Sequence, residues 1–242
     1  MILEGIKITK FYGSLRVLNE VDFSVKKGEV LGLIGPNGAG KTTLFDIITG
    51  LTPPTSGRII FEGKDITKLK PHQICRRGIG RTFQIARPFQ NMSALKNVMI
   101  GLMFGKKNNL SIKDAKREAL NLLNFVGLAG KENTLGKNLT VTEQKKLELA
   151  KALATKPKLL LLDEVAAGLS PTAMLEALEL LNKVKETGIT VFVIDHVLKA
   201  IMEICERIIV LDNGNKIAEG KPAEIARDER VIETYLGERY VY

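Results

Sequence analysis

A glycine-rich segment, GPNGAGKTTLF, lies between two apolar runs early in the chain. It fits the pattern Gly-x-x-x-x-Gly-Lys-Thr, in which glycines let backbone N–H groups turn toward phosphate oxygens. In that pattern Lys41 reaches the β- and γ-phosphates of a nucleoside triphosphate, and the Thr42 hydroxyl is a ligand for Mg²⁺. The alternative is a chance glycine-rich turn, but an apolar strand pattern before it and a helical pattern after it favour phosphate binding. The predicted nucleotide-binding residues are Gly35, Pro36, Asn37, Gly38, Ala39, Gly40, Lys41, Thr42 and Thr43.

A second acidic site follows in KLLLLDE, an apolar strand pattern with Asp163 and Glu164 at its carboxyl end. Ligands bind at the carboxyl ends of strands in open α/β sheets. We expect Asp163 to hold Mg²⁺ directly or through water, and Glu164 to orient and deprotonate the attacking water. The alternative is a solvated carboxylate pair that begins a loop.

Three single residues are further candidates. Gln84 follows a strand pattern, where its amide oxygen could reach the metal and sense the γ-phosphate. His196 ends the strand pattern TVFVID, where its imidazole could contact the γ-phosphate. Tyr12 lies in a turn before Gly13 and could stack on an adenine ring. Each is ordinary by itself, as a loop glutamine, a strand-end histidine or a half-buried tyrosine, and only the set in this order points to a site.

The elements that must position these side chains alternate between strand and helix patterns. A largely helical stretch interrupts the alternation, which indicates a mainly parallel α/β core with a helical insert and an antiparallel β portion on the N-terminal side. We expect one domain over residues 1–242, with the core at about 1–85 and 158–242 and the insert at about 86–157. Strands are expected at residues 2–9, 17–25, 30–34, 58–61, 158–164 (KLLLLDE), 190–195 and 207–211, with a tight hairpin turn at Asn213-Gly214. Helices are expected at 42–49, within 93–128, and at 140–154, 171–186, 197–205 and about 223–242.

The composition narrows the class of protein. The 242 residues carry 36 basic and 27 acidic side chains, a formal net charge of +9. That excess favours an anionic partner, such as a nucleotide, a nucleic acid or a membrane surface, although simple solubility explains it equally well. Two distant cysteines, no apolar run long enough to span a bilayer and no signal-peptide pattern at the start predict a reduced, cytoplasmic chain.

Over essentially its full length the chain resembles the ATP-binding subunits of ABC transporters. The segments GLIGPNGAGKTTLFDIITG, GKDIT, GIGRTFQ and AAGLSPT most resemble those of branched-chain (hydrophobic) amino-acid importers. The resemblance implies an ABC-type P-loop NTPase core that binds ATP and Mg²⁺. It also implies a role for each candidate: Tyr12 as the adenine-stacking aromatic, 35–42 as the Walker A loop, Gln84 as the Q-loop glutamine and a metal ligand, Asp163 and Glu164 as the Walker B pair, and His196 with Lys41 and Glu164 as catalytic residues.

Two positions depart from the family pattern. The signature Leu-Ser-Gly-Gly-Gln, which in the family touches the ATP held by a partner subunit, is Leu-Thr-Val-Thr-Glu here, at residues 139–143. We expect Thr140, Thr142 and Glu143 to take that place, with branched side chains where glycines allow close contact and a negative charge near phosphate. The pattern Thr140-x-x-Glu143 is also a capping box, which would turn the carboxylate back onto the helix start. The second departure is Val165, which follows the Walker B pair where proline is frequent, and we expect it to be harmless.

The resemblance implies a motor subunit at the cytoplasmic face of the membrane. Its implied partners are a second ATPase subunit, two permease subunits and, indirectly, an extracytoplasmic substrate-binding protein. The altered signature at residues 139–143 further predicts that the two ATPase subunits differ and form a heterodimer with two unequal sites. The permease contact is expected between Gln84 and about Gly105, including Arg87, Pro88 and Phe89. An exporter ATPase, such as one for lipopolysaccharide extraction, is the alternative within the family. A soluble ATPase acting on nucleic acid is the alternative outside it, but no nucleic-acid partner is expected because basic and aromatic residues do not form a stripe.

Overall fold

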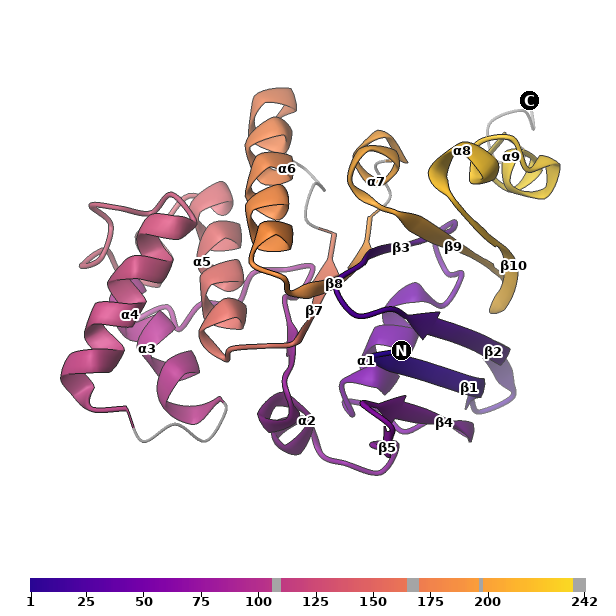
Figure 1. Cartoon of the computed structure of the whole chain (residues 1–242), viewed down its shortest axis with the longest axis horizontal. Helices are drawn as coiled ribbons and strands as arrows, with labels where there is room; N and C mark the ends of the chain where they lie inside the picture. Colours follow the sequence, from indigo (N-terminus) through magenta and orange to yellow (C-terminus); the bar gives the residue numbers. More distant parts are fainter. Residues whose placement is uncertain (106–109, 165–169, 196–197, 237–242) are drawn as a thin grey trace.

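The computed structural model describes residues 1–105, 110–164, 170–195 and 198–236. Within these ranges the strands form two sheets, one of four strands in the order β2-β1-β4-β5 and one of six in the order β10-β9-β3-β8-β7-β6. The two sheets lie at one end of the molecule, and helices α3, α4 and α5 form a separate group at the other end (Figure 1). The expected α/β class, with a parallel core sheet and an antiparallel N-terminal part, is confirmed.

The six-stranded sheet carries the site. Its strands are parallel except for β10, which pairs antiparallel with β9. Every residue of β3, β7 and β8 is buried, as expected for strands covered on both faces. In chain order the strands are β3 (Val30–Ile34), β6 (Ile79–Arg81), β7 (Leu159–Asp163), β8 (Thr190–Ile194), β9 (Arg207–Asp212) and β10 (Asn215–Gly220).

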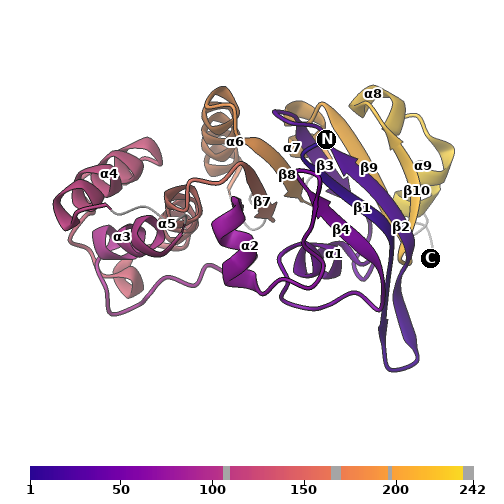
Figure 2. The ribbon, with the colours of Figure 1, turned by 60° about the horizontal axis from the view of Figure 1, so that its bottom comes forward.

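The antiparallel sheet and helix α1 lie next to each other, and together they cover one face of the parallel sheet. Figure 2 shows β1, β2 and β4 next to one another, and their inward side chains share a core with α1 and with one face of β3. The ring of Phe192 on β8 lies 5.1 Å from that of Phe45 on α1 and 5.9 Å from that of Phe23 on β2. The strands of this sheet are β1 (Leu3–Tyr12), β2 (Leu15–Val25), β4 (Ser56–Phe61) and β5 (Lys64–Asp65).

The other face of the parallel sheet packs against helices from the second half of the chain, in a core that extends into the group α3 to α5. None of the helices in the described ranges is long and apolar enough to cross a membrane. In chain order the helices are α1 (Lys41–Ile48), α2 (Pro71–Arg77), α3 (Ala94–Phe104), α4 (Ile112–Phe125), a 3₁₀ turn at Gly136–Asn138, α5 (Val141–Ala154), α6 (Pro171–Glu186), α7 (Leu198–Ile204), α8 (Pro222–Ile225) and α9 (Glu229–Leu236).

Most expected elements are found within a few residues of their predicted bounds. Strand β3 and helix α6 match them fully, and β7 is one residue shorter at each end than the predicted run. The Asn213-Gly214 hairpin joins β9 to β10 with both residues at positive φ. The sequence prediction was wrong in omitting α2. This helix has seven residues, of which only Ile74 is buried, so it shows no helical hydrophobic period. The boundaries of the helical insert stay a prediction.

Candidate functional site

The phosphate loop lies between β3 and α1, as the motif requires. Gly40 caps α1 in a left-handed conformation (φ 98°) and offers no side chain to the first N–H groups of the helix. A helix start of this kind attracts anions, because its N–H groups and the helix dipole both favour negative charge. The Lys41 ammonium donates hydrogen bonds to the carbonyl oxygens of Gly35 and Pro36, at 2.7 and 2.8 Å. The loop therefore already holds its lysine across the space between β3 and the helix start.

Two glycines of this loop are dictated by packing as well as by ligand approach. A Cβ atom on Gly35 would lie 2.1 Å from the carbonyl oxygen of Leu211, which no real structure accommodates. A Cβ on Gly40 would lie 2.7 Å from the side chain of Leu18 on β2. Gly38, by contrast, has positive φ and open space where its Cβ would be. The first glycine of the loop thus packs against the parallel sheet and the last against the antiparallel sheet. The middle of the loop is open to solvent, and Asn37 there is exposed.

Asp163 is level with the start of the phosphate loop. It pairs with Ile194 of β8, and Leu33 of β3 pairs with the same residue from the other side. Parallel strands in register bring their carboxyl ends to one edge, so the two halves of the expected metal site are two strand spacings, about 10 Å, apart. This agrees with the expected arrangement of a Walker A loop and a Walker B carboxylate.

A buried arginine holds that carboxylate. Arg81, at the end of β6, donates from one nitrogen to Asp163 (2.9 Å) and from another to Asp46 of α1 (2.6 Å). The Arg81 and Asp163 side chains are only 5% and 2% exposed. Burial raises the pKa of the Asp163 carboxyl, and the bond from Arg81 opposes that rise. The other oxygen of Asp163, Oδ1, is buried without a hydrogen-bond partner among the described residues.

Glu164 and Gln84 are in direct contact. The Gln84 side-chain nitrogen donates to Glu164 Oε2 at 2.7 Å, and both side chains stand at the carboxyl edge of the parallel sheet. Glu164 has φ 54°, a left-handed conformation that is uncommon for a residue with a side chain. Its N–H donates to the carbonyl of Ile194 at 2.8 Å, which ties the end of β7 to β8.

The start of α5 forms the expected capping box. Thr140 Oγ1 accepts from the N–H of Glu143 at 3.3 Å, and Glu143 Oε2 accepts from the N–H of Thr140 at 2.9 Å. Glu143 also pairs with Lys131 at 3.0 Å. These donors, first the Thr140 N–H and then Lys131, lower the pKa of Glu143. Val141, which follows Thr140 in the chain, is 69% exposed.

Two sequence candidates are placed less completely. Tyr12, at the end of β1, is 48% exposed, and the Lys10 ammonium lies 4.8 Å from the centre of its ring. One ring face therefore contacts a cation, and the exposed ring is suited to stacking. His196 lies outside the described residues, although Asp195 directly before it is buried at the end of β8.

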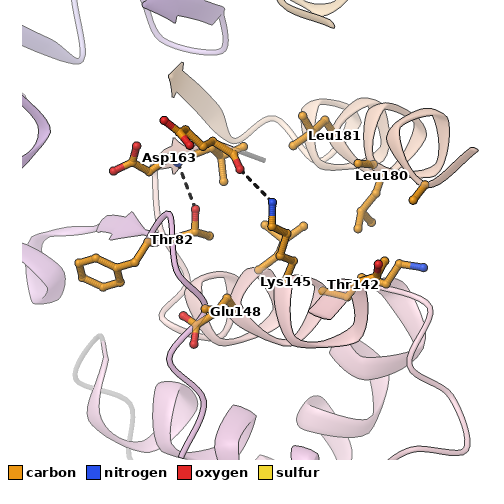
Figure 3. A pocket seen from close by; sticks show the side chains of 15 residues that line it. Thr82, Thr142, Lys145, Glu148, Asp163, Leu180 and Leu181 are labelled. Atoms are coloured by element: carbon orange, nitrogen blue, oxygen red, sulfur yellow. Dashed lines mark hydrogen bonds between the residues drawn. The ribbon is translucent and has the colours of Figure 1, made fainter. Parts of the chain in front are cut away.

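Arg81 and Lys145 are functional candidates that the sequence reasoning missed. Lys145, on α5, donates from Nζ to the backbone oxygen of Glu164 at 3.2 Å (Figure 3). It lines a cavity of about 50 Å³ between α5, α6 and the end of β7 together with Thr142 and both Walker B carboxylates. A charged residue that ends the buried strand Ile79–Arg81 was an available signal for Arg81, whereas nothing local distinguishes Lys145 from its neighbours.

Comparisons with known proteins agree with this geometry. The ABC transporter family profile matches residues 18–167, and a profile for the branched-chain amino acid ATP-binding cassette transporter matches residues 215–241. The lipopolysaccharide export system ATP-binding protein LptB of Escherichia coli (strain K12) is 36% identical over 238 residues, which are 98% of each chain. The high-affinity branched-chain amino acid transport ATP-binding protein BraF of Pseudomonas aeruginosa is 36% identical over 250 residues, again 98% of each chain.

Solved structures show the same fold. The ADP conformation of MJ1267, an ATP-binding cassette of an ABC transporter, superposes with a TM-score of 0.88 at 33% identity and covers 98% of both chains. The dimeric cassette MJ0796 bound to ADP and Pi superposes with a TM-score of 0.84 at 28% identity, covering 91% of this chain and 98% of that one.

Proposed function

Because the chain belongs to the ABC transporter ATP-binding family, we propose that it drives the import of branched-chain or other hydrophobic amino acids. The chain is an ATPase, the nucleotide-binding subunit of a membrane transporter. The observation that carries the substrate class is the match of residues 215–241 to the branched-chain profile. That stretch includes β10, α8 and α9, whose Ile225 and Val231 are buried in the core of the parallel sheet.

Lipopolysaccharide export is the second candidate, because LptB is as similar in overall identity as BraF. A strain deleted for this chain distinguishes the two. Import predicts that uptake of labelled leucine or isoleucine falls on deletion and returns with the wild-type chain but not with Lys41→Ala. Unchanged uptake together with lipopolysaccharide retained in the inner membrane would overturn the import proposal and support export.

The phosphate loop and its lysine bind the nucleotide. Backbone N–H groups of residues 37–43 surround the phosphates, Lys41 neutralises the β- and γ-phosphates, and Tyr12 stacks on the adenine. Lys41 already lies across this loop, bonded to two of its carbonyls, so ATP has to compete with those bonds for the ammonium. Stacking reads the base weakly, because every base has a π-face.

The carboxylates suit Mg²⁺ and water. The orphaned, buried Oδ1 of Asp163 is the kind of oxygen that a cation satisfies, and the hydroxyl of Thr42, exposed in the first turn of α1, is a second ligand. When bound, Mg²⁺ supplies charge neutralisation at the β- and γ-phosphates. Arg81 holds the other oxygen of Asp163, and the amide oxygen of Gln84 is proposed as a further ligand.

Glu164 is the proposed base for the attacking water. Its side chain already accepts a hydrogen bond from Gln84, so the two residues hold a polar site at the sheet edge where the γ-phosphate is expected. His196 is proposed to contact the γ-phosphate from the end of β8. Glu164 then removes a proton from the water while Lys41 stabilises the charge that develops on the phosphate.

ABC cassettes act as dimers, and we propose that this chain pairs with a different ATPase subunit. In a head-to-tail pair, residues 139–143 face the ATP of the partner. The capping box directs the Glu143 carboxylate to its own helix start and to Lys131, which removes a charge clash. The exposed Val141 and the branched Thr142 still keep the backbone farther from phosphate than glycines would. The site that combines the partner's phosphate loop with residues 139–143 of this chain is therefore proposed to hydrolyse ATP more slowly.

Two permease subunits are proposed to contact a groove beside the Gln84 segment. The groove has a volume of about 310 Å³ and lies between α2, α3 and α5, where Phe83 and Phe89 are 41% and 46% exposed. Exposed aromatic side chains of this kind mark interaction surfaces. Contact there places the chain at the cytoplasmic face of the membrane, with an extracytoplasmic binding protein acting on the far side of the permease.

A further inference from the structure

The backbone of Glu164 has a conformation that its surroundings must hold. A residue with a side chain at φ 54° is sterically disfavoured and persists only where neighbouring groups determine it. The direction of the Glu164 carboxylate follows from that backbone, since the residue directly follows the rigid, fully buried strand β7. A change in φ at this position would turn the carboxylate away from the sheet edge.

Among the described residues, hydrogen bonds reach Glu164 from three separate parts of the chain. The carbonyl of Ile194 on β8 accepts from its N–H at 2.8 Å, and the Gln84 side chain donates to its carboxylate at 2.7 Å. The third comes from α5, where Lys145 Nζ donates to its backbone oxygen at 3.2 Å. Figure 3 shows Lys145 extending from the helix toward the end of β7. The first bond comes from strand β8 and the second from the segment after strand β6, so both come from the sheet side of the molecule. The third comes from α5, in the helical group.

The surroundings of the Lys145 side chain restrict where its ammonium can lie. Its side chain is half-buried and lines the cavity between α5 and α6. Burial lowers the pKa of its ammonium, and the nearby Asp195 and Glu164 carboxylates oppose that effect. The ammonium is thus close to the ends of both β7 and β8, the two strands whose carboxyl ends carry the proposed catalytic residues.

We propose that Lys145 is a positioning residue that fixes the backbone of Glu164 from α5 and so sets the angle of its carboxylate toward the attacking water. The inference rests on the proposed role of Glu164 as the base. It goes beyond that role, because it makes the catalytic rate depend on where α5 stands relative to the sheet. The same helix begins at Thr140, in the segment expected to face the partner's nucleotide.

Lys146 provides a matched control on the same helix. It is the next residue, carries the same charge, lines the same cavity and pairs with Glu176 of α6 at 2.9 Å instead of with Glu164. A general loss of charge or of helix packing would affect both lysines. A loss confined to Lys145 reports its bond to Glu164.

The experiment measures kcat, KM and the affinity for a fluorescent ATP analogue for the full chain assembled with its transporter partners. Lys145→Met is expected to lower kcat about tenfold, with KM and affinity within twofold of wild type, because ATP binding does not involve Lys145. Lys145→Arg keeps donors of similar reach and is expected to restore at least half of the rate. Lys146→Met is expected to stay within twofold of wild type in all three quantities.

A parallel Glu164→Gln variant separates the two proposals. If Glu164→Gln loses more than a hundredfold in kcat and Lys145→Met stays within twofold of wild type, the role of Lys145 is overturned and that of Glu164 stands. An equal loss in Lys146→Met, or a loss of affinity that accounts for the loss of rate, also overturns it. If Glu164→Gln is fully active, the base itself is wrong and the inference falls with it. Should Lys145→Met fail to fold, Lys145→Gln takes its place, since the glutamine side chain is one atom shorter than that of lysine and carries no charge, which weakens the bond to the Glu164 backbone oxygen.

Discussion

At the scale of single residues, Lys41 and Glu164 are expected to fail in different ways. In the proposed mechanism Lys41 neutralises phosphate charge both before and during the reaction, so Lys41→Ala should remove most of the nucleotide affinity. In the proposed mechanism Glu164 acts on the water alone, so Glu164→Gln should keep ATP binding and reduce turnover more than a hundredfold, about 3 kcal/mol of transition-state stabilisation. Equilibrium binding of a fluorescent ATP analogue and steady-state hydrolysis measure the two effects. Hydrolysis by Glu164→Gln at close to the wild-type rate would contradict the assignment.

Arg81 is expected to matter for stability before it matters for catalysis. Arg81→Met leaves the carboxylate of Asp163 buried beside an apolar side chain, and breaking a buried ion pair from one side costs about 3–5 kcal/mol. The free energy of unfolding in urea measures this cost. The matched control is Lys158→Met, which breaks an exposed pair with Glu62 and should cost about 1 kcal/mol or less. Similar losses in both variants would show that the buried cluster carries no special weight.

The residues of the site could be predicted from sequence where their spacing is local. The loop 35–43 and the pair Asp163 and Glu164 are contiguous motifs at element ends, and the structure places them at one sheet edge. Arg81 was not predicted because its partner Asp163 is 82 residues away in the chain. Lys145 was not predicted because its hydrogen bond is to a backbone oxygen, and every residue type has one. Long-range pairing of this kind has no signature in a single sequence, so the one local signal was the charged residue at the end of the buried strand Ile79–Arg81.

At the scale of elements, the capping box of α5 gives a pH-dependent stability. The pKa of Glu143 in the fold lies below its ordinary value of 4.5, so its contribution is present above that pH and is lost as the pH falls through the lowered value. Glu143→Ala should therefore lower the free energy of unfolding at neutral pH, by about 1 kcal/mol as for other lost helix caps. The difference between the two proteins should shrink as the pH falls below 4.5. Urea unfolding at a series of pH values tests this, and a difference that is constant down to the acid transition would contradict it.

Element prediction succeeded where burial imposes a clear period. Strands β3 and β7 are short, fully buried and mostly apolar runs, and α4 has polar and apolar faces. Both kinds of element can therefore be recognised from the sequence. Helix α2 and strand β6 are too short for a period to develop, since they have seven and three residues. Their existence depends on tertiary contacts, such as the pairing of β6 with β7.

At the scale of the whole molecule, the altered signature predicts two unequal ATP sites in the assembled transporter. The competent site combines Lys41 and Glu164 of this chain with the partner's signature, and the impaired one uses residues 140–143 of this chain. Inactivating Glu164 should therefore cost much more ATPase activity than inactivating the partner's equivalent glutamate. Steady-state hydrolysis by the two mutant complexes measures this. Equal losses, or a strongly active homodimer of this chain alone, would rule it out.

The strand order of the parallel sheet also governs how the chain is made. The two neighbours of β3 are β8 and β9, which begin at Thr190 and Arg207, so β3 leaves the ribosome long before either can pair with it. At about 5–20 residues per second that delay is roughly 8 to 30 seconds, during which an apolar strand has both hydrogen-bonding edges open. Synonymous codon changes that slow translation of the intervening stretch lengthen this exposure. Such changes are expected to divert newly made protein into aggregates while leaving the mature sequence, and every contact described above, unaltered.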